Sequence, residues 1–349
     1  MTGNEPRVAV IGSGAWGTTL ALLVARSEPV TLWCHSAETA THLRETRRNG
    51  RRLPGVELPE AVSVATDATA LGGAELIIVA VPSAHVRGIV ARLAPAIPAG
   101  ADVLSVVKGL ERGTLLRMTE VIAHAAGIDP ARVAALSGPN LAIEIARGLP
   151  ASAVVAAEDP VLAERIVARL ARREFRLYTN TDVLGVELCG ALKNVIAIAA
   201  GAADGLGFGD NGKAGLMTRG LAEMMRVGIA AGANPLTFAG LAGIGDVIAT
   251  CGSTLSRNHR LGEELANGRT WSDIEAGLPG VAEGAYTVDA ALALADRLGV
   301  EMPIAREVHN ALFEGKSVRR CLIDLLARES KDELADFQAW VERLGVAAE

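Results

Sequence analysis

A glycine-rich loop between an apolar run and a helical pattern constrains the fold more than any other feature. The run Val8–Ile11 is followed at once by Gly12-Ser13-Gly14-Ala15-Trp16-Gly17, and helical periodicity continues over Thr18–Ser27. With this spacing the first glycine makes a tight turn, the second admits a pyrophosphate, and the third lets the helix pack on the sheet. Free N–H groups at the helix start then favour the phosphates. The beginning of the chain therefore predicts a dinucleotide-binding unit.

The rest of the N-terminal half alternates apolar runs with helical patterns. Six further runs are predicted to be strands: Val30–Cys34, Leu76–Val81, Val103–Val107, Val133–Leu136, Ala153–Ala156 and Phe175–Tyr178. Helical patterns lie between them, as in Val86–Leu93 and Leu115–Ala126. Such alternation is typical of an α/β fold with helices on both faces of a mostly parallel sheet. We expect a Rossmann-type domain over residues 1–185.

After Asp182 the pattern becomes helical throughout. The predicted helices are Val183–Ala203, Ala214–Ala231, Ala285–Leu298, Ile304–Glu314 and Val318–Ala327. We therefore expect a second, all-α domain over residues 186–349. A cleft between two domains of different class is a common place for a ligand, so the substrate is expected there.

Charge and cysteine content narrow the functional classes. The net charge of -6 argues against nucleic acid or an anionic membrane as partner, so an anionic substrate must be held by local cations. The four cysteines are scattered without a Cys-x-x-Cys pair, which predicts reduced structural cysteines and no metal site. The first residues lack the apolar segment of a secretion signal. The apolar stretch around Val195–Ala203 falls short of the roughly 20 residues that span a bilayer. We expect a cytoplasmic protein without a membrane span.

The end of the second predicted strand bears on the choice between NAD and NADP. NAD sites usually have an acidic residue there to bind the ribose 2′-hydroxyl. This strand ends in Trp33-Cys34-His35-Ser36, so His35 is expected near the ribose. Five arginines follow, each able to meet a 2′-phosphate or simply to face solvent: Arg44, Arg47, Arg48, Arg51 and Arg52. This pattern favours NADP, alongside NAD. Pro82-Ser83, at the end of another strand, is also expected to lie close to the dinucleotide.

Charged and polar residues at strand ends and inside one apolar helix are candidates for substrate chemistry. Lys108 follows a buried strand and precedes a glycine, which suits anion binding better than packing. Asn140 follows another strand and can serve a ligand or only cap a helix. Lys193 and Asn194 interrupt an apolar helix, where an ammonium is costly unless it is paired or functional. Desolvation lowers a lysine pKa toward neutrality, as carbinol–carbonyl acid/base chemistry requires. The alternative is a lysine that extends to the helix end.

Two later segments add to these candidates. Asp246 and Thr250 are four residues apart and share a face if the segment is helical. Ser256-Arg257-Asn258 precedes the helical run Arg260–Ala266. A serine or asparagine there can act only as a cap, but together with an arginine the three residues form a phosphate pocket.

With these segments in view, the chain resembles the bacterial NAD(P)-dependent sn-glycerol-3-phosphate dehydrogenases over essentially its whole length. The matching segments are Gly12–Gly17, Lys108-Gly109-Leu110, Ser137-Gly138-Pro139, Lys193-Asn194-Val195-Ile196-Ala197, Gly205-Leu206-Gly207-Phe208-Gly209, Thr218-Arg219-Gly220-Leu221-Ala222-Glu223, Gly243-Ile244-Gly245-Asp246, Ser256-Arg257-Asn258 and Val281-Ala282-Glu283-Gly284. The chain departs from the pattern at Asn140, where many relatives have Thr or Ser, and at Ile143, where many have Lys and to which we assign no role.

The resemblance implies that Lys193 accepts the proton of the C2 hydroxyl, with Asp246 and Asn194 orienting it. Combined with the residues singled out above, the expected substrate contacts are Lys108, Gly138, Asn140, Lys193, Asp246, Thr250, Ser256, Arg257 and Asn258. The expected cofactor contacts are Gly12, Ser13, Gly14, Trp16, Gly17, His35, Arg52, Pro82, Lys108, Ala142, Arg257, Val281 and Glu283.

The resemblance also implies a reaction. We expect reversible reduction of dihydroxyacetone phosphate by NADPH or NADH to sn-glycerol 3-phosphate, for glycerophospholipid synthesis, by a homodimer. A β-hydroxyacid dehydrogenase is an alternative, because it shares the architecture and an interdomain lysine. A dinucleotide sensor that has lost catalysis is another, although a sensor has no need of a desolvated lysine.

Overall fold

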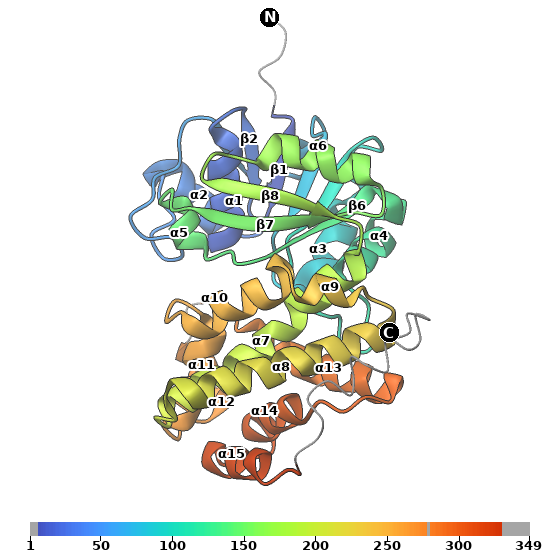
Figure 1. Cartoon of the computed structure of the whole chain (residues 1–349). Coiled ribbons are helices and arrows are strands. Elements are labelled where there is room, and N and C mark those ends of the chain that lie inside the picture. Colours follow the sequence, from blue (N-terminus) through green and yellow to red (C-terminus); the bar gives the residue numbers. More distant parts are fainter. Residues whose placement is uncertain (1–5, 278–279, 330–349) are drawn as a thin grey trace, which may run out of the picture.

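The computed structural model describes residues 6–277 and 280–329, which form a sheet domain above a helical domain in Figure 1. Its strands are β1 (Val8–Ile11), β2 (Val30–Trp33), β3 (Val62–Ala65), β4 (Leu76–Val79), β5 (Asp102–Ser105), β6 (Val133–Ser137), β7 (Ala151–Ala156) and β8 (Phe175–Asn180). They form one sheet in the order β3-β2-β1-β4-β5-β6-β7-β8. All neighbouring strands are parallel except β6 and β7, which are antiparallel. The predicted Rossmann-type, mostly parallel sheet is confirmed.

Helices cover both faces of this sheet, which explains the continuous apolar runs of its strands. They are α1 (Ala15–Ala25), α2 (Ala37–Thr46), α3 (Val86–Leu93), α4 (Met118–Ala126), α5 (Ala142–Ala146) and α6 (Pro160–Leu170). Alternate residues of β1 enter different cores: Val8 and Val10 pack on the face with α1 and α6, and Ala9 and Ile11 on the face with α3 and α4. Because β1 is central and parallel to β2 and β4, their carboxyl ends meet at one edge.

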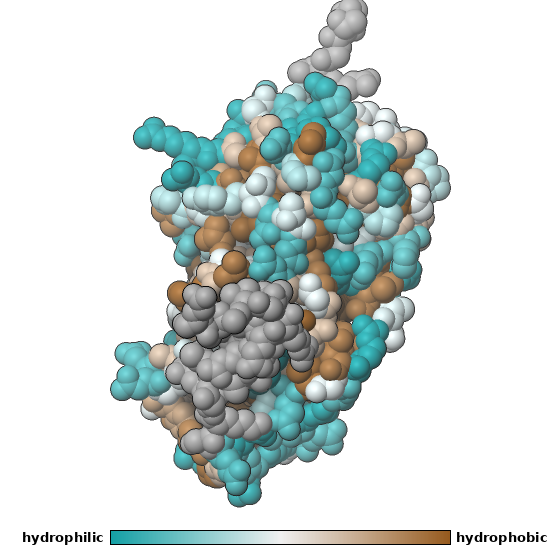
Figure 2. All heavy atoms as spheres, turned by 45° about the vertical axis from the view of Figure 1, so that its right-hand side comes forward, coloured by the Kyte–Doolittle hydropathy of each residue, from teal (hydrophilic) through white to brown (hydrophobic). Residues whose placement is uncertain are grey.

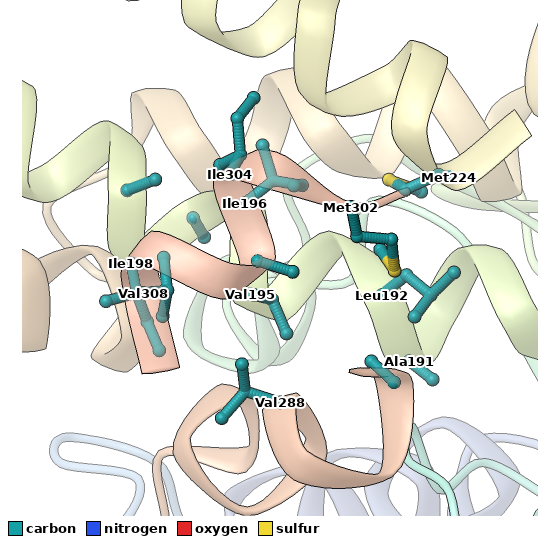
Figure 3. Close-up of a cluster of buried hydrophobic side chains, with 14 of the residues drawn as sticks. Ala191, Leu192, Val195, Ile196, Ile198, Met224, Val288, Met302, Ile304 and Val308 are labelled. Carbon is teal, nitrogen blue, oxygen red and sulfur yellow. The ribbon is translucent and has the colours of Figure 1, made fainter. Parts of the chain in front are cut away.

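The helical domain is built around one long helix. Its elements are α7 (Val183–Gly205), α8 (Gly209–Ala231), α9 (Pro235–Phe238), α10 (Asp246–Gly252), α11 (Arg257–Ala266), α12 (Trp271–Gly277), α13 (Glu283–Leu298), α14 (Pro303–Phe313) and α15 (Val318–Leu326). Figure 3 shows side chains of α7, such as Leu192 and Val195, packed among Met224 of α8, Val288 of α13 and Val308 of α14. The predicted all-α second domain is confirmed over its described part; residues 330–349 lie outside the described residues.

Within the part of the chain that the structure describes, two helical segments are long and apolar enough by composition to cross a bilayer. One is α7, whose 23 residues are longer than the apolar stretch around Val195–Ala203, which alone is too short to span a bilayer. Within the protein, 94% of its most apolar window is buried, as expected for the core helix of a folded domain. The other, Pro235–Gly252, is half buried. The space-filling view shows hydrophobic side chains gathered mainly around the junction of the two domains (Figure 2).

The structure departs from the predicted elements where the sequence signal is weak. Strand β3 was not predicted, because it lies at the sheet edge and only Val62 of its four residues is buried. The short helices α9, α10 and α12 were also not predicted as separate elements. Helix α11 begins at Arg257 rather than Arg260. The expected domain limit at 185/186 falls in the first turn of α7, just after β8 ends at Asn180.

Candidate active site

The glycine loop has the shape that a dinucleotide pyrophosphate requires. Gly12 has a φ of +116°, and a Cβ there would lie 2.6 Å from the Ala80 carbonyl oxygen. A Cβ on Gly17 would lie 2.0 Å from the Gly12 carbonyl oxygen, whereas nothing lies within 4 Å of one on Gly14. The N-terminus of α1 has no side-chain cap, so its free N–H groups remain available. The protein's own packing therefore demands Gly12 and Gly17, while Gly14 leaves space for a ligand.

The loop is held from outside by a residue that no sequence pattern pointed to. Asn49 is buried, and its Nδ2 donates to the Ser13 carbonyl oxygen at 2.9 Å and to Thr18 Oγ1 at 2.7 Å. Trp16, an expected cofactor contact, packs its ring edge-on against Phe175. Its buried indole N–H has no partner among the described residues, which leaves a donor for a bound group.

Three of the five arginines after β2 have structural partners. Arg44 donates to the Val64 carbonyl oxygen, Arg47 to those of Leu58 and Val62, and Arg48 pairs with Glu57. Arg51 is exposed. Arg52 lies with Arg257 around Gly280: a Cβ on this glycine would be 3.6 Å from Arg52 Nη1 and 2.8 Å from Arg257 Nη1. Neither guanidinium makes a close ion pair in the described ranges, and the Glu283 carboxylate acts on Arg257 only from farther away, so the two form a cationic corner suited to phosphate.

The most concentrated chemistry lies between β5, β6, α7 and α10. Lys193 Nζ donates to Thr250 Oγ1 at 2.6 Å and lies 3.1 Å from Asp246 Oδ1. Lys108 Nζ lies 2.5 Å from Asp246 Oδ2 and donates to the Gly138 carbonyl oxygen at 2.9 Å. One carboxylate, 1% exposed, thus joins two ammonium groups from different domains. Lys193 is 6% exposed and paired, so it does not extend to the helix end.

Local structure explains how these side chains meet. Lys108 follows β5 at the carboxyl edge of the sheet, and its side chain passes over α7 at Gly190. A Cβ on Gly190 would lie 2.8 Å from Ser137 Oγ and 3.3 Å from Lys108 Cγ. Asp246 begins α10 directly after the π-helical turn η5 (Leu241–Gly245). Asp246 and Thr250 share a helix face as predicted, with Thr250 Oγ1 donating to Asp246 Oδ1 at 3.0 Å.

The charged groups in this cluster shift one another's pKa values. Burial lowers the pKa of Lys193 to about 8; the Asp246 carboxylate opposes this effect and the Lys108 ammonium adds to it. Burial alone would raise the pKa of Asp246, but the two ammonium groups outweigh it and hold that pKa below its usual value. Asp246 therefore stays ionised, and Lys193 can change its protonation state near neutral pH.

Asn194 has a different partner from the one expected. Its Oδ1 accepts from Asn258 Nδ2 at 2.9 Å, and Asn258 Oδ1 accepts from the Gly284 N–H at 3.0 Å. No hydrogen bond joins Asn194 to Lys193 or Asp246 within the described residues. Successive residues on a helix point about 100° apart, so Lys193 faces α10 while Asn194 faces α11. The two asparagines join α7, α11 and α13 beside the lysine.

The phosphate-pocket candidate begins α11. Ser256 is the N-cap, its Oγ accepting from the His259 N–H at 3.2 Å, and Arg257 is the first helical residue. The helix crosses α7 closely: a Cβ on Gly262 would lie 2.0 Å from the Ile198 carbonyl oxygen. This crossing places Asn258 against Asn194 of α7, with Arg257 next to it at the start of α11.

The remaining expected contacts line the carboxyl edge of the sheet. Both polar atoms of the Asn140 side-chain amide are buried without a partner in the described structure. Ala142, at the start of α5, accepts from Thr19 Oγ1 on α1 through its carbonyl oxygen at 3.1 Å. Asn140 thus offers unused donors and an unused acceptor, which fits a bound ligand.

A second contact between the domains lies beyond β4. Ser83, directly after Pro82, donates to the Glu283 carboxylate from its N–H at 3.2 Å and from Oγ at 2.5 Å. Glu283 begins α13 two residues after Val281, and burial raises its pKa. These contacts bring Pro82, Val281 and Glu283 to one place. The sequence pointed to Pro82 and Glu283 separately but gave no sign that Ser83 links them.

Sequence reasoning also missed an interdomain ion pair. Buried Glu187 on α7 lies 3.1 Å from Arg117 and accepts from the Thr119 N–H and Oγ1 at 2.9 and 2.6 Å. It fixes α7 against the start of α4, two turns before Lys193. In residues 6–277 and 280–329, no three His, Cys, Asp or Glu side chains gather in a way that would hold a metal ion.

Comparison with known proteins places this geometry in a family. The family model described as "NAD-dependent glycerol-3-phosphate dehydrogenase N-terminus" matches residues 7–163. The model of the C-terminal part of the same family matches residues 182–323. Glycerol-3-phosphate dehydrogenase (NAD(P)+) of Frankia casuarinae is 48% identical, covering 94% of this chain and 98% of its own. That of Corynebacterium glutamicum is 46% identical, covering 93% and 99%. The crystal structure of glycerol-3-phosphate dehydrogenase from Coxiella burnetii superposes with a TM-score of 0.88 at 36% identity, covering 93% and 100%. The chain belongs to the NAD-dependent glycerol-3-phosphate dehydrogenase family.

Proposed function

We propose that this protein is an NAD(P)-dependent sn-glycerol-3-phosphate dehydrogenase that interconverts dihydroxyacetone phosphate and sn-glycerol 3-phosphate. The observation that carries the proposal is the Lys193–Asp246–Lys108 cluster, which lies at the carboxyl edge of a dinucleotide-binding sheet. The nicotinamide, when bound, supplies or accepts the hydride at C2 of the substrate. The chain's residues bind and orient the substrate and move the proton.

Lys193 is suited to proton transfer at the C2 oxygen. An ammonium group has three N–H donors, and Thr250 and Asp246 engage two of them. The third is free for the substrate oxygen. In ketone reduction the ammonium form donates a proton to this oxygen, and in alcohol oxidation the neutral amine accepts one. A pKa of about 8 makes both forms accessible at physiological pH.

Lys108 and Asp246 set the electrostatics around this proton. Two ammonium groups and one carboxylate leave the cluster with one net positive charge, which suits a phosphorylated substrate in a chain of net charge -6. Lys108 has two donors engaged, by Asp246 and the Gly138 carbonyl oxygen, and one left for a substrate oxygen. Asp246 holds both lysines in place, and its charge keeps the Lys193 pKa from falling further.

We assign the substrate phosphate to Arg257 and the first turn of α11, which includes Asn258, and we expect the unpartnered amide of Asn140 to contact the same substrate. In the described residues no carboxylate lies within ion-pair distance of this guanidinium, although the Glu283 charge acts on it from farther away, and the helix start adds N–H groups. Asn258 already bonds to Asn194 and to Gly284, so its main role is to position α11. Holding the phosphate away from C2 aligns the reacting carbon.

Initial rates of dihydroxyacetone phosphate reduction with NADPH and with NADH test the proposal. We expect turnover with both and a preference for NADPH. A panel of 3-hydroxy acids is the control for the β-hydroxyacid alternative: activity on these acids, without activity on sn-glycerol 3-phosphate, would overturn the assignment. Dinucleotide binding with no turnover of any polyol phosphate would indicate a sensor instead.

We further propose that the protein supplies sn-glycerol 3-phosphate for glycerophospholipid synthesis, and that it works as a homodimer in the cytoplasm. The four cysteines are buried and free, which supports a reducing compartment. Light scattering coupled to size-exclusion chromatography measures the assembly, and a mass of one chain, 36.1 kDa, would contradict the dimer.

A further inference from the structure

An arginine from a different part of the sheet domain lies at the end of β2. Arg92 is in the last turn of α3, 57 residues after His35. Its Nη2 lies 3.0 Å from His35 Nδ1, and its guanidinium carbon lies 5.1 Å from the centre of the Trp33 ring. The guanidinium is thus held at the carboxyl end of β2 by one hydrogen bond and one aromatic face.

The surroundings leave this guanidinium free for an anion. Arg92 and His35 are exposed, and Arg92 makes no ion pair with a carboxylate in the described residues. One of its five N–H groups faces His35, and the others are available. Because Nδ1 accepts this bond, the ring of His35 carries its proton on Nε2, which adds another donor at the same place.

The nearby arginines suggested by the sequence are directed elsewhere. Arg44 and Arg47 donate to backbone carbonyl groups, and Arg48 pairs with Glu57. Arg52 lies beside Arg257 at Gly280. Arg92 is the arginine that the structure holds against His35.

In sheets of this type, the adenosine ribose lies at the end of the second strand, where an acidic residue marks NAD binding. Here that place carries His35 and Arg92 instead. We propose that Arg92, with His35, forms the subsite for the ribose 2′-phosphate and gives the protein its preference for NADPH over NADH. A guanidinium binds a phosphate through charge-assisted, two-pronged hydrogen bonds, whereas a neutral 2′-hydroxyl gains little from it. The inference rests on the proposed function, because it requires a bound dinucleotide.

The test compares Arg92→Gln and Arg92→Lys with the wild-type protein. Arg48→Gln is the matched control, since it removes an exposed arginine already paired with Glu57. Calorimetry gives the affinity for adenosine 2′,5′-bisphosphate and for AMP, and steady-state kinetics give KM for NADPH and NADH. We expect Arg92→Gln to weaken binding of the bisphosphate and raise KM for NADPH at least about tenfold. Values for AMP and NADH stay within about twofold, Arg92→Lys recovers part of the loss, and Arg48→Gln behaves as wild type.

Three results would overturn the inference. If Arg92→Gln loses equal affinity for adenosine 2′,5′-bisphosphate and for AMP, Arg92 stacks on the adenine instead. If the variant binds the bisphosphate as wild type does, Arg92 is not part of the site. If the wild-type protein has equal affinities for NADPH and NADH, there is no preference to explain. Each of these leaves the dehydrogenase assignment intact. Failure of the proposed function gives a different result, namely a wild-type protein that binds neither dinucleotide or reduces no dihydroxyacetone phosphate.

Discussion

Replacing Asp246 by asparagine removes the charge that holds two lysines together and keeps the size of the side chain. In the native protein its carboxylate lies 3.1 Å from Lys193 Nζ and 2.5 Å from Lys108 Nζ, with 2% of the side chain exposed. The amide can still accept hydrogen bonds. The substitution therefore changes mainly the electrostatic environment of Lys193, whose pKa of about 8 depends on this carboxylate.

The size of the effect follows from the distance. Asp246 Oδ1 lies 3.1 Å from Lys193 Nζ, but the negative charge is shared between both carboxylate oxygens, so the effective separation is about 4 Å. At an effective dielectric constant of about 20, such an opposite charge contributes about 4 kcal/mol, which corresponds to about 3 pKa units. Because asparagine keeps a dipole in place, we expect a fall of about 2 to 3 units, so that the Lys193 pKa drops to about 5 to 6. At pH 7 about nine tenths of native Lys193 is protonated, against about one tenth or less in the variant. Ketone reduction needs the ammonium form, so kcat/KM at pH 7 falls about tenfold or more.

The assay is kcat/KM for dihydroxyacetone phosphate reduction across the pH range from about 5 to 10, which reports groups of the free enzyme. The native profile should fall above about pH 8, and the Asp246→Asn profile should fall above about pH 5 to 6. Thr250→Val is the matched control, because it removes a hydrogen bond from Lys193 without changing a charge, and its midpoint should move by less than about one unit. A midpoint that stays near pH 8 in a folded Asp246→Asn protein would refute the reasoning.

Three further predictions concern packing and domain contacts. Gly17→Ala forces a Cβ against the Gly12 carbonyl oxygen and should lower the free energy of unfolding in urea by about 1–3 kcal/mol. The Cβ of Gly14→Ala meets no atom, so this variant should keep native stability and bind NADPH about tenfold more weakly. Equal losses of stability in the two variants would contradict this prediction. Glu187→Gln removes the buried charge beside Arg117 and should lower the unfolding free energy by about 2 kcal/mol, and an unchanged urea midpoint would disprove it. Ser83→Ala removes the hydroxyl that donates to the Glu283 carboxylate and keeps the backbone N–H that also donates to it, so KM for NADPH should rise while thermal stability changes little. A native KM would argue against a role for that hydroxyl contact.

The sequence predicted the helices whose apolar residues recur with helical periodicity and the strands that are buried on both faces. Strands such as β1 and β4 are continuous apolar runs because both of their faces are buried. Strand β3 lies at the edge with only Val62 buried, so its run carries little signal. The antiparallel direction of β7 against β6 depends on the path of the chain through α5, which no local pattern encodes.

The candidate site shows the same division. Lys193 was recognised because a charge inside an apolar helix is unusual, but its partners come from α10 and β5, far away in the chain. The resemblance implied that Asn194 orients Lys193, yet neighbours on a helix face different directions and Asn194 contacts Asn258. Arg92 had no sequence signal, because its contact with His35 joins α3 to the end of β2.

The central claim is that Lys193 moves the proton at the C2 oxygen, and Lys193→Met tests it most directly. The substitution leaves Asp246 paired with Lys108, so charge balance and folding should survive. We predict that dihydroxyacetone phosphate reduction falls about 10²–10⁴-fold in kcat, as when a general acid is removed, while NADPH still binds. Near-native turnover by a folded Lys193→Met protein would contradict the account.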